Sequence, residues 1–212
     1  MNYIETDIIF LRHCAIDGPR AFYGSGTDIG CIRESLANVP KIPAGYFAEV
    51  FVSPMKRCRE TLEATGISGS ITVAPDLREL GFGSIDGKPF AEFSEKEKEI
   101  LAALNRGENV AFPGGENAED LKQRTGNFIE TVLKAEHAIR ESRRILAVTH
   151  SGIISTVLQR ILECPILNIL QKASPGLGRF TGIRYFQDTD RDFSVASAFP
   201  RILFLNSATP GN

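Results

Sequence analysis

Short apolar segments that alternate with helical patterns constrain the fold of this chain most strongly. The clearest of them is 145–149, a β-branched and apolar run that ends in Thr149. Three other segments have the same character: 7–11, 49–52 and 71–74. Helical patterns that begin with a serine follow two of the segments, at 53–62 and 151–158. Because parallel crossovers place helices over a sheet, this alternation predicts a three-layer α/β sandwich with a mostly parallel central sheet and helices on both faces.

The stretch 81–144 is too long for a single crossover between strands. It contains a glycine-rich turn region and then a charged helix, expected at about 90–104. After a loop at Pro113-Gly114-Gly115, a second helix with one apolar face is expected at about 117–141. We therefore expect an inserted helical cap at about 81–144.

The length of 212 residues is sufficient for one domain with a proper core, expected to span residues 1–205. Near its end, 183–186 and 193–198 predict a hairpin or two edge strands. The final residues, 206–212, are expected to form a disordered tail.

Charge and composition exclude several classes of protein. The chain has 24 Lys and Arg against 26 Asp and Glu, so its net charge of −2 indicates neither a nucleic-acid nor a membrane partner. The apolar runs are far shorter than the roughly 20 residues that a membrane span needs, and acidic residues stand where a signal peptide would be basic. The four cysteines form no C-x-x-C pair and indicate neither a metal site nor a disulfide framework. These features favour a cytoplasmic protein.

Two of the three histidines follow directly after predicted strands. His13 follows the first strand with Arg12 before it, and His150 follows the strand 145–149. Ligands of open α/β sheets bind at the carboxyl ends of the strands, so both imidazoles are expected at one edge of the sheet. The second strand ends there too, and it places Arg57 in the first turn of a helix whose amides favour an anion. Two arginines and two histidines in one pocket predict a site for a phosphoryl group.

Each of these residues also has an ordinary structural interpretation. A single histidine at a strand end is usually structural, and an arginine in a first helical turn is usually solvated. Only their combination favours a ligand site. The third histidine, His137, lies in a helical segment without such neighbours and is expected at the surface.

Five short motifs follow one another between Ile8 and Gly152. They are Leu11-Arg12-His13, Ser53-Pro54-x-x-Arg57-x-x-x-Thr61, Leu77-x-Glu79 with Gly83-x-x-Asp86-Gly87, Pro113-Gly114-Gly115-Glu116 and Val148-Thr149-His150-Ser151-Gly152. In this order they resemble the motifs of the histidine phosphatase superfamily, also called phosphoglycerate mutase-like, and the ordered set is far more specific than any one motif. The segment 78–87 most resembles the small bacterial branch that includes α-ribazole phosphatase.

The resemblance implies a role for each candidate residue. His13 is the expected nucleophile, which attacks phosphorus and becomes a transient phosphohistidine while its other ring nitrogen donates to a backbone carbonyl. Arg12, Arg57 and His150 are expected to bind the phosphoryl oxygens, with His150 most effective as an imidazolium. Glu79 is expected to protonate the leaving oxygen and then to accept a proton from water. No metal or other cofactor is expected, since these cations supply the positive charge.

Cys14 departs from the family pattern, because glycine usually follows the Arg-His pair. In addition, residues 15–19 lack the glutamate and asparagine that are common there. A side chain at position 14 could narrow the pocket or add an oxidisable thiol, and we expect the enzyme to remain active with it. The missing asparagine removes one expected phosphate donor, which favours weak activity.

Three functions fit these residues. The short chain and modest insertion favour a phosphatase that hydrolyses a small phosphomonoester through His13. The alternatives are a phosphoglycerate-type mutase and a phosphate-binding pseudo-enzyme with little turnover. The expected partner is a small phosphorylated metabolite: resemblance indicates α-ribazole 5′-phosphate, and sugar phosphates or phosphoserine fit the same pocket. A homodimer is compatible with the sequence, but no feature decides it.

Overall fold

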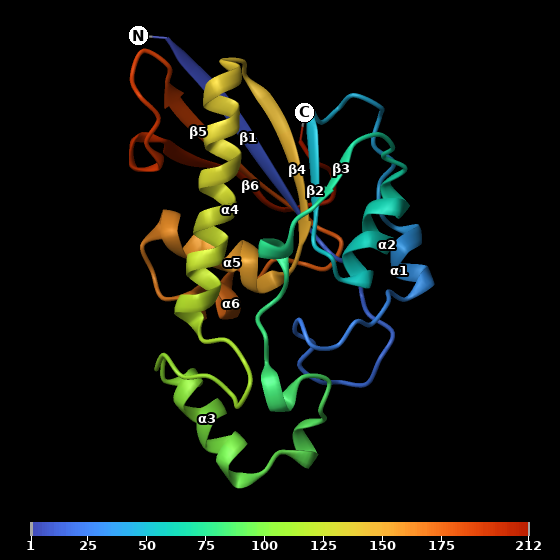
Figure 1. The fold of residues 1–212 in the computed structure, drawn as a ribbon. Coiled ribbons are helices and arrows are strands. Elements are labelled where there is room, and N and C mark those ends of the chain that lie inside the picture. The colour runs from blue at the N-terminus through green and yellow to red at the C-terminus, as the bar shows by residue number, and fades with distance from the viewer. Residues whose placement is uncertain (1, 212) are drawn as a thin grey trace.

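The computed structural model describes residues 2–211 and contains one central sheet between helical layers (Figure 1). The strands lie in the order β3-β2-β4-β1-β5-β6. Their bounds are β1 (Tyr3–Arg12), β2 (Glu49–Val52), β3 (Ile71–Val73), β4 (Arg143–Thr149), β5 (Phe180–Asp188) and β6 (Phe199–Ser207). The first four strands are mutually parallel, β5 pairs antiparallel with β1, and β6 pairs antiparallel with β5. The predicted α/β sandwich with a mostly parallel sheet is confirmed.

Helices cover both faces of this sheet. Their bounds are α1 (Arg33–Ala37), α2 (Lys56–Thr65), α3 (Glu95–Asn105), α4 (Ala118–Ile139), α5 (Ser151–Leu162) and α6 (Ile166–Lys172). Side chains of α4 and α5 bury one face around Ile8 and Phe10, and α2 packs on the opposite face around Ile9 and Leu11. Neighbouring residues of β1 thus alternate between two cores, as the period of a strand buried on both sides requires.

The cap lies beyond the carboxyl ends of the parallel strands and contains α3 (Figure 1). It has a small core of its own, built around Ile85, Phe93 and Phe112. α3 begins later than expected, because Ser94 and Glu97 form a capping box that starts the helix after a separate 3₁₀ turn. The helix α4 packs on the sheet rather than in the cap. The projecting segment is therefore smaller than the expected range of 81–144.

The C-terminal strand differs from the prediction. Residues 193–198 do not form a strand, because 195–197 make a 3₁₀ turn and the strand β6 follows it. Pro200 lies next to the start of β6, an edge position where the missing N–H of proline is tolerated. β6 extends two residues into the range 206–212 expected as a tail, and residue 212 lies outside the described residues.

Within residues 2–211, no single helix is long and apolar enough to cross a membrane. The helices α5 and α6 satisfy the length and composition criteria only as a pair, and the chain bends by 115° between them.

Candidate active site

The carboxyl ends of the central strands bring both candidate histidines together. The parallel register aligns Arg12 of β1 with Thr149 of β4, and the next residues are His13 and His150. The amide of His13 donates to the Thr149 carbonyl at 2.9 Å, and the two imidazole ring centroids are 5.1 Å apart. Ser53 follows β2 at the same edge, and its hydroxyl lies 2.9 Å from Nε2 of His150. The structure thus brings the two histidines to one sheet edge, as the sequence predicts.

His13 is held as a neutral imidazole with one nitrogen free. Its Nδ1 lies 2.7 Å from the Cys14 carbonyl, which can only accept, so Nδ1 carries the proton. Burial, followed by the positive charges of Arg57 and Arg12, lowers the pKa of His13 to about 3. The unprotonated Nε2 is therefore available as a nucleophile at neutral pH.

His150 is fully buried, and both of its ring nitrogens have polar neighbours. Arg57 Nε donates to its Nδ1 at 3.3 Å, which leaves Nε2 to carry the proton towards the Ser53 hydroxyl. Burial is the main cause that lowers the pKa of His150 well below its ordinary value, with further contributions from His13 and Arg57. Without a bound anion, burial and these neighbours thus disfavour a second proton on His150, and the imidazolium expected for the phosphate-bound site stays a prediction.

Arg57 has no solvent-exposed surface and binds backbone carbonyls of the loop between β1 and α1. Its Nη2 donates to the carbonyls of Tyr23 and Gly24 at 3.2 and 2.9 Å, and its Nη1 donates to the Thr27 carbonyl at 3.2 Å. Together with the bond to His150, four N–H groups of the guanidinium are used. One N–H of the five therefore remains for an oxyanion.

Arg12 offers a donor with no protein partner. Its Nη1 donates to the Pro175 carbonyl at 2.6 Å, but its buried Nε has no hydrogen-bond partner among the described residues. Burial lowers the pKa of Arg12, and the negative charge of Glu79 partly offsets that effect. A buried N–H without a partner is costly, so a phosphate oxygen at this position would be well bound.

Glu79 is held against the start of α5. Its two carboxylate oxygens accept from the amides of Leu80 at 2.9 Å and Gly152 at 3.2 Å. A Cβ atom on Gly152 would overlap Glu79 Oε1, so glycine at this position permits the close approach. The residue is only 8% exposed, so the carboxylate lies largely out of bulk solvent.

Cys14 fits the structure without projecting towards the histidines. Its amide donates to Thr61 Oγ1 at 2.9 Å, and its thiol points to the carbonyl of Ser35 on α1 at 3.6 Å. Burial raises the pKa of the Cys14 thiol, which keeps it protonated. Sequence reasoning missed the supporting roles of Thr61 and Ser53. Their signals were the spacing of Thr61 four residues after Arg57 and the position of Ser53 after a strand.

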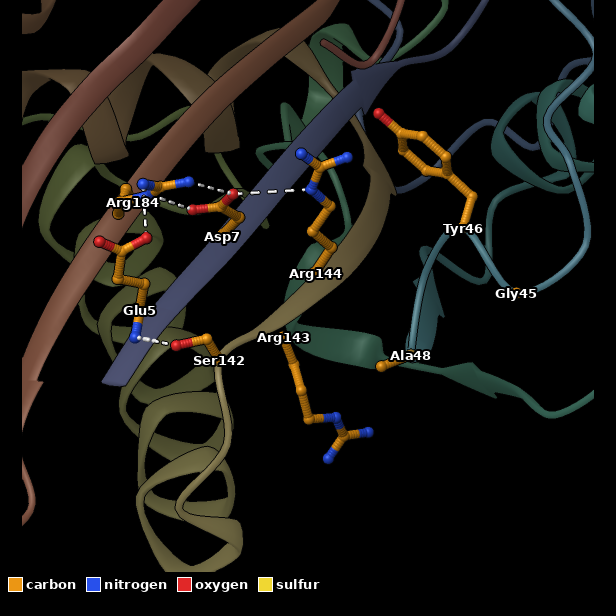
Figure 2. A pocket seen from close by; sticks show the side chains of 9 residues that line it. All are labelled: Glu5, Asp7, Gly45, Tyr46, Ala48, Ser142, Arg143, Arg144 and Arg184. Atoms are coloured by element: carbon orange, nitrogen blue, oxygen red, sulfur yellow. Dashed lines mark hydrogen bonds and ion pairs between the residues drawn. The ribbon is translucent and has the colours of Figure 1, made fainter. Parts of the chain in front are cut away.

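A cavity of about 390 Å³ lies at the opposite ends of β1 and β4 (Figure 2). Arg184 pairs there with Glu5 and with both oxygens of Asp7, and Arg144 approaches Asp7 at 3.8 Å. The arginines of this cavity thus form ion pairs with carboxylates. At the strand ends near His13, by contrast, the Nε donor of Arg12 has no partner among the described residues. The unpaired Arg12 donor therefore makes the carboxyl ends of the strands the better candidate for an anion site.

Comparison with known proteins shows the family of this chain. The sequence model of the histidine phosphatase superfamily (branch 1) matches residues 8–190. An Arabidopsis thaliana metal-independent phosphoserine phosphatase is 26% identical over 208 residues, which cover 91% of this chain and 84% of that protein. An adenosylcobalamin/alpha-ribazole phosphatase of Salmonella typhimurium is 25% identical over 126 residues, or 58% of this chain and 60% of that protein.

Solved structures share the fold over nearly the whole chain. The alpha-ribazole phosphatase from Shigella flexneri superposes with a TM-score of 0.72 at 20% identity and covers 97% of this chain and 98% of its own. A mycobacterial glucosyl-3-phosphoglycerate phosphatase also has a TM-score of 0.72, at 18% identity, with coverages of 96% and 99%. The relatives named here are phosphatases, and the family match over residues 8–190 establishes that this chain belongs to the histidine phosphatase superfamily.

Proposed function

We propose that this protein hydrolyses a small phosphomonoester in two steps through a phosphohistidine on His13. The single observation that carries the proposal is the fixed tautomer of His13, whose Nδ1 donates to the Cys14 carbonyl and leaves Nε2 unprotonated. The low pKa of His13 supports the same role, because a protonated imidazole cannot attack phosphorus. Family membership is consistent with this chemistry.

The phosphoryl group would be bound by the cations around His13. The unpaired Nε of Arg12 and the remaining N–H of Arg57 supply donors for its oxygens. His150 would join them by taking up a proton when a dianion enters, because an adjacent negative charge favours the charged form. These groups would stabilise the charge on the transferring phosphoryl group.

Bond making and proton transfer would proceed in sequence. Nε2 of His13 forms a bond to phosphorus while the bond from phosphorus to the leaving oxygen breaks, and Glu79 gives that oxygen a proton. Water then attacks the phosphohistidine, Glu79 takes a proton from it, and His13 is released with inorganic phosphate. The carboxylate of Glu79 is suited to this exchange because backbone amides hold it in one place.

Phosphate release from a set of phosphomonoesters tests the function. The set should contain α-ribazole 5′-phosphate, phosphoserine, sugar phosphates and 4-nitrophenyl phosphate, because related phosphatases are named for the first two. Wild type should release phosphate from at least one metabolite without a bisphosphate primer. His13→Ala should lower kcat by more than about 10³-fold, as expected for loss of a nucleophile. His137→Ala, a histidine of α4 outside the site, is the matched control.

Rapid-quench labelling separates the remaining alternatives. A labelled phosphoenzyme that forms in wild type, decays to inorganic phosphate and is absent in His13→Ala supports the phosphatase. A long-lived phosphoenzyme that requires a bisphosphate primer would identify a mutase instead. Binding of phosphate without any labelling of His13 would identify a pseudo-enzyme.

A further inference from the structure

We propose that Arg124, together with Glu116, is a positioning residue pair that fixes the loop carrying Glu79. This inference rests on the proposed function, since it assigns to Glu79 the proton transfer described above. Arg124 lies on α4, and Glu116 ends the Pro-Gly-Gly-Glu motif, for which the phosphoryl pocket provides no role.

Arg124 is 11% exposed at its side chain and makes five hydrogen bonds. Three of them reach the backbone carbonyls of Asp76, Arg78 and Glu79, at 2.9, 2.6 and 3.0 Å. The other two join Nε and Nη2 to the two carboxylate oxygens of Glu116, both at 2.9 Å. A guanidinium has five N–H groups, so every donor of Arg124 is used to hold this loop.

Glu116 binds the same loop at Gly81, two residues after Glu79. Its Oε2 accepts from the amide of Gly81 at 2.8 Å, and its own amide donates to the Gly81 carbonyl at 2.8 Å. Gly83 has a φ of +54°, and a Cβ there would overlap the carbonyl of Pro113. The glycine thus lets the two loops pack backbone to backbone. The negative charge on Glu116 is favoured by Arg124 and the Gly81 amide, which lower its pKa against the effect of burial.

The backbone of Glu79 is therefore held from one side and its carboxylate from the other. Arg124 binds the Glu79 carbonyl, while the amides of Leu80 and Gly152 bind the carboxylate oxygens. Loss of the guanidinium would leave three carbonyls without their side-chain donor, two of them partly buried, and release the loop. The carboxylate would then spend less time within proton-transfer distance of the leaving oxygen.

A dependence on the leaving group distinguishes positioning from general destabilisation. An alkoxide leaves slowly unless it is protonated, whereas 4-nitrophenolate leaves readily without a proton. The value of kcat/KM reports formation of the phosphoenzyme, in which the leaving group departs. Arg124→Ala should therefore lower kcat/KM for an alkyl phosphate such as phosphoserine or glycerol phosphate by about 10- to 100-fold, and that for 4-nitrophenyl phosphate by less than about threefold.

The variants are measured together with wild type, Glu79→Gln and a control. Arg124→Lys retains the charge but has three donors, so it should show the same selectivity loss as Arg124→Ala. Glu116→Gln retains the shape and should show a smaller loss. The control is Lys122→Ala, an exposed residue of α4 that pairs with Glu119, which should match wild type on both substrates. Circular dichroism and thermal unfolding establish that each variant is folded.

The proposal is tested by the ratio of kcat/KM for the alkyl phosphate to kcat/KM for 4-nitrophenyl phosphate. A ratio that falls in Arg124→Ala, Arg124→Lys and Glu79→Gln but not in Lys122→Ala supports positioning. Equal losses on both substrates, or no loss on either, would overturn it. If the Arg124 variants do not fold, the ratio in Glu116→Gln decides alone. Wild type without a His13-dependent phosphoenzyme would contradict the proposed function itself, whereas a normal phosphoenzyme with an unchanged ratio would contradict only the role of Arg124.

Discussion

Acid should destabilise this protein partly through His13, because the folded state keeps that imidazole neutral. The pKa of His13 is about 3 in the folded protein, against 6.5 for an ordinary histidine. Between these two pH values, His13 is protonated in the unfolded chain but not in the folded protein. The stabilising contribution is therefore fully present above about pH 6.5 and is lost as the pH falls towards the folded pKa.

The magnitude follows from the interval between the two pKa values. A decrease from 6.5 to about 3 corresponds to about 5 kcal/mol in all, at about 1.4 kcal/mol per pH unit. Only part of this interval lies between pH 7 and pH 4.5, where the expected loss is about 2.5 kcal/mol. His13→Asn removes the titrating group, so over the same interval it should lose about 2.5 kcal/mol less than wild type.

Urea unfolding at the two pH values, followed by circular dichroism, measures the free energies. His150 and the carboxylates also titrate, so both proteins lose stability in acid and only the difference between them reports on His13. Replacing a buried side chain also lowers the free energy of unfolding by an amount that is the same at both pH values. This amount cancels when the change between pH 7 and pH 4.5 is compared for the two proteins. If His13→Asn loses as much free energy as wild type between pH 7 and pH 4.5, His13 is not held neutral in the folded state.

Three further predictions concern the site. Gly152→Ala should push the Glu79 carboxylate from its place, and we expect kcat/KM for alkyl phosphates to fall by about 10- to 100-fold; an unchanged value would contradict the contact. Wild type should hydrolyse 4-nitrophenyl phosphate because the Cys14 thiol faces Ser35, and an inactive wild type with an active Cys14→Gly variant would show instead that the thiol blocks the site. Sulfate, which stays dianionic, should bind with proton uptake by His150 and more weakly as the pH rises. Calorimetry in buffers of different ionisation enthalpy measures that uptake, and its absence would argue against protonation of His150.

The sequence was sufficient for the parts of the structure that depend on local patterns. Runs of β-branched and apolar residues located the parallel strands, although β3 is exposed at all three of its residues. The carboxyl ends of β1 and β4 located His13 and His150. The edge strand β6 was missed because it is half exposed and contains Pro200, so its pattern is weak compared with that of β4.

The electrostatic state of the site could not be predicted in the same way. The neutral form of His150 depends on its complete burial and on the orientation of Arg57, which are set by tertiary packing. The five bonds of Arg124 are equally non-local, since they join α4 to a loop about 45 residues earlier in the chain. Neither residue type nor spacing shows which carbonyls a buried guanidinium will bind.

The one-to-one pairing of β1 with β4 sets more than the stability of the sheet. Arg12 lies opposite Thr149, and adjacent side chains of a strand point to opposite faces. If the pairing slipped by a single residue, the side chain of Arg12 would point to the face that His13 now occupies, and that of His13 to the face of Arg12. The two imidazoles would then be separated. Under the proposed mechanism, catalysis therefore requires the correct alignment of these two strands, and recovery of turnover during refolding would report their register.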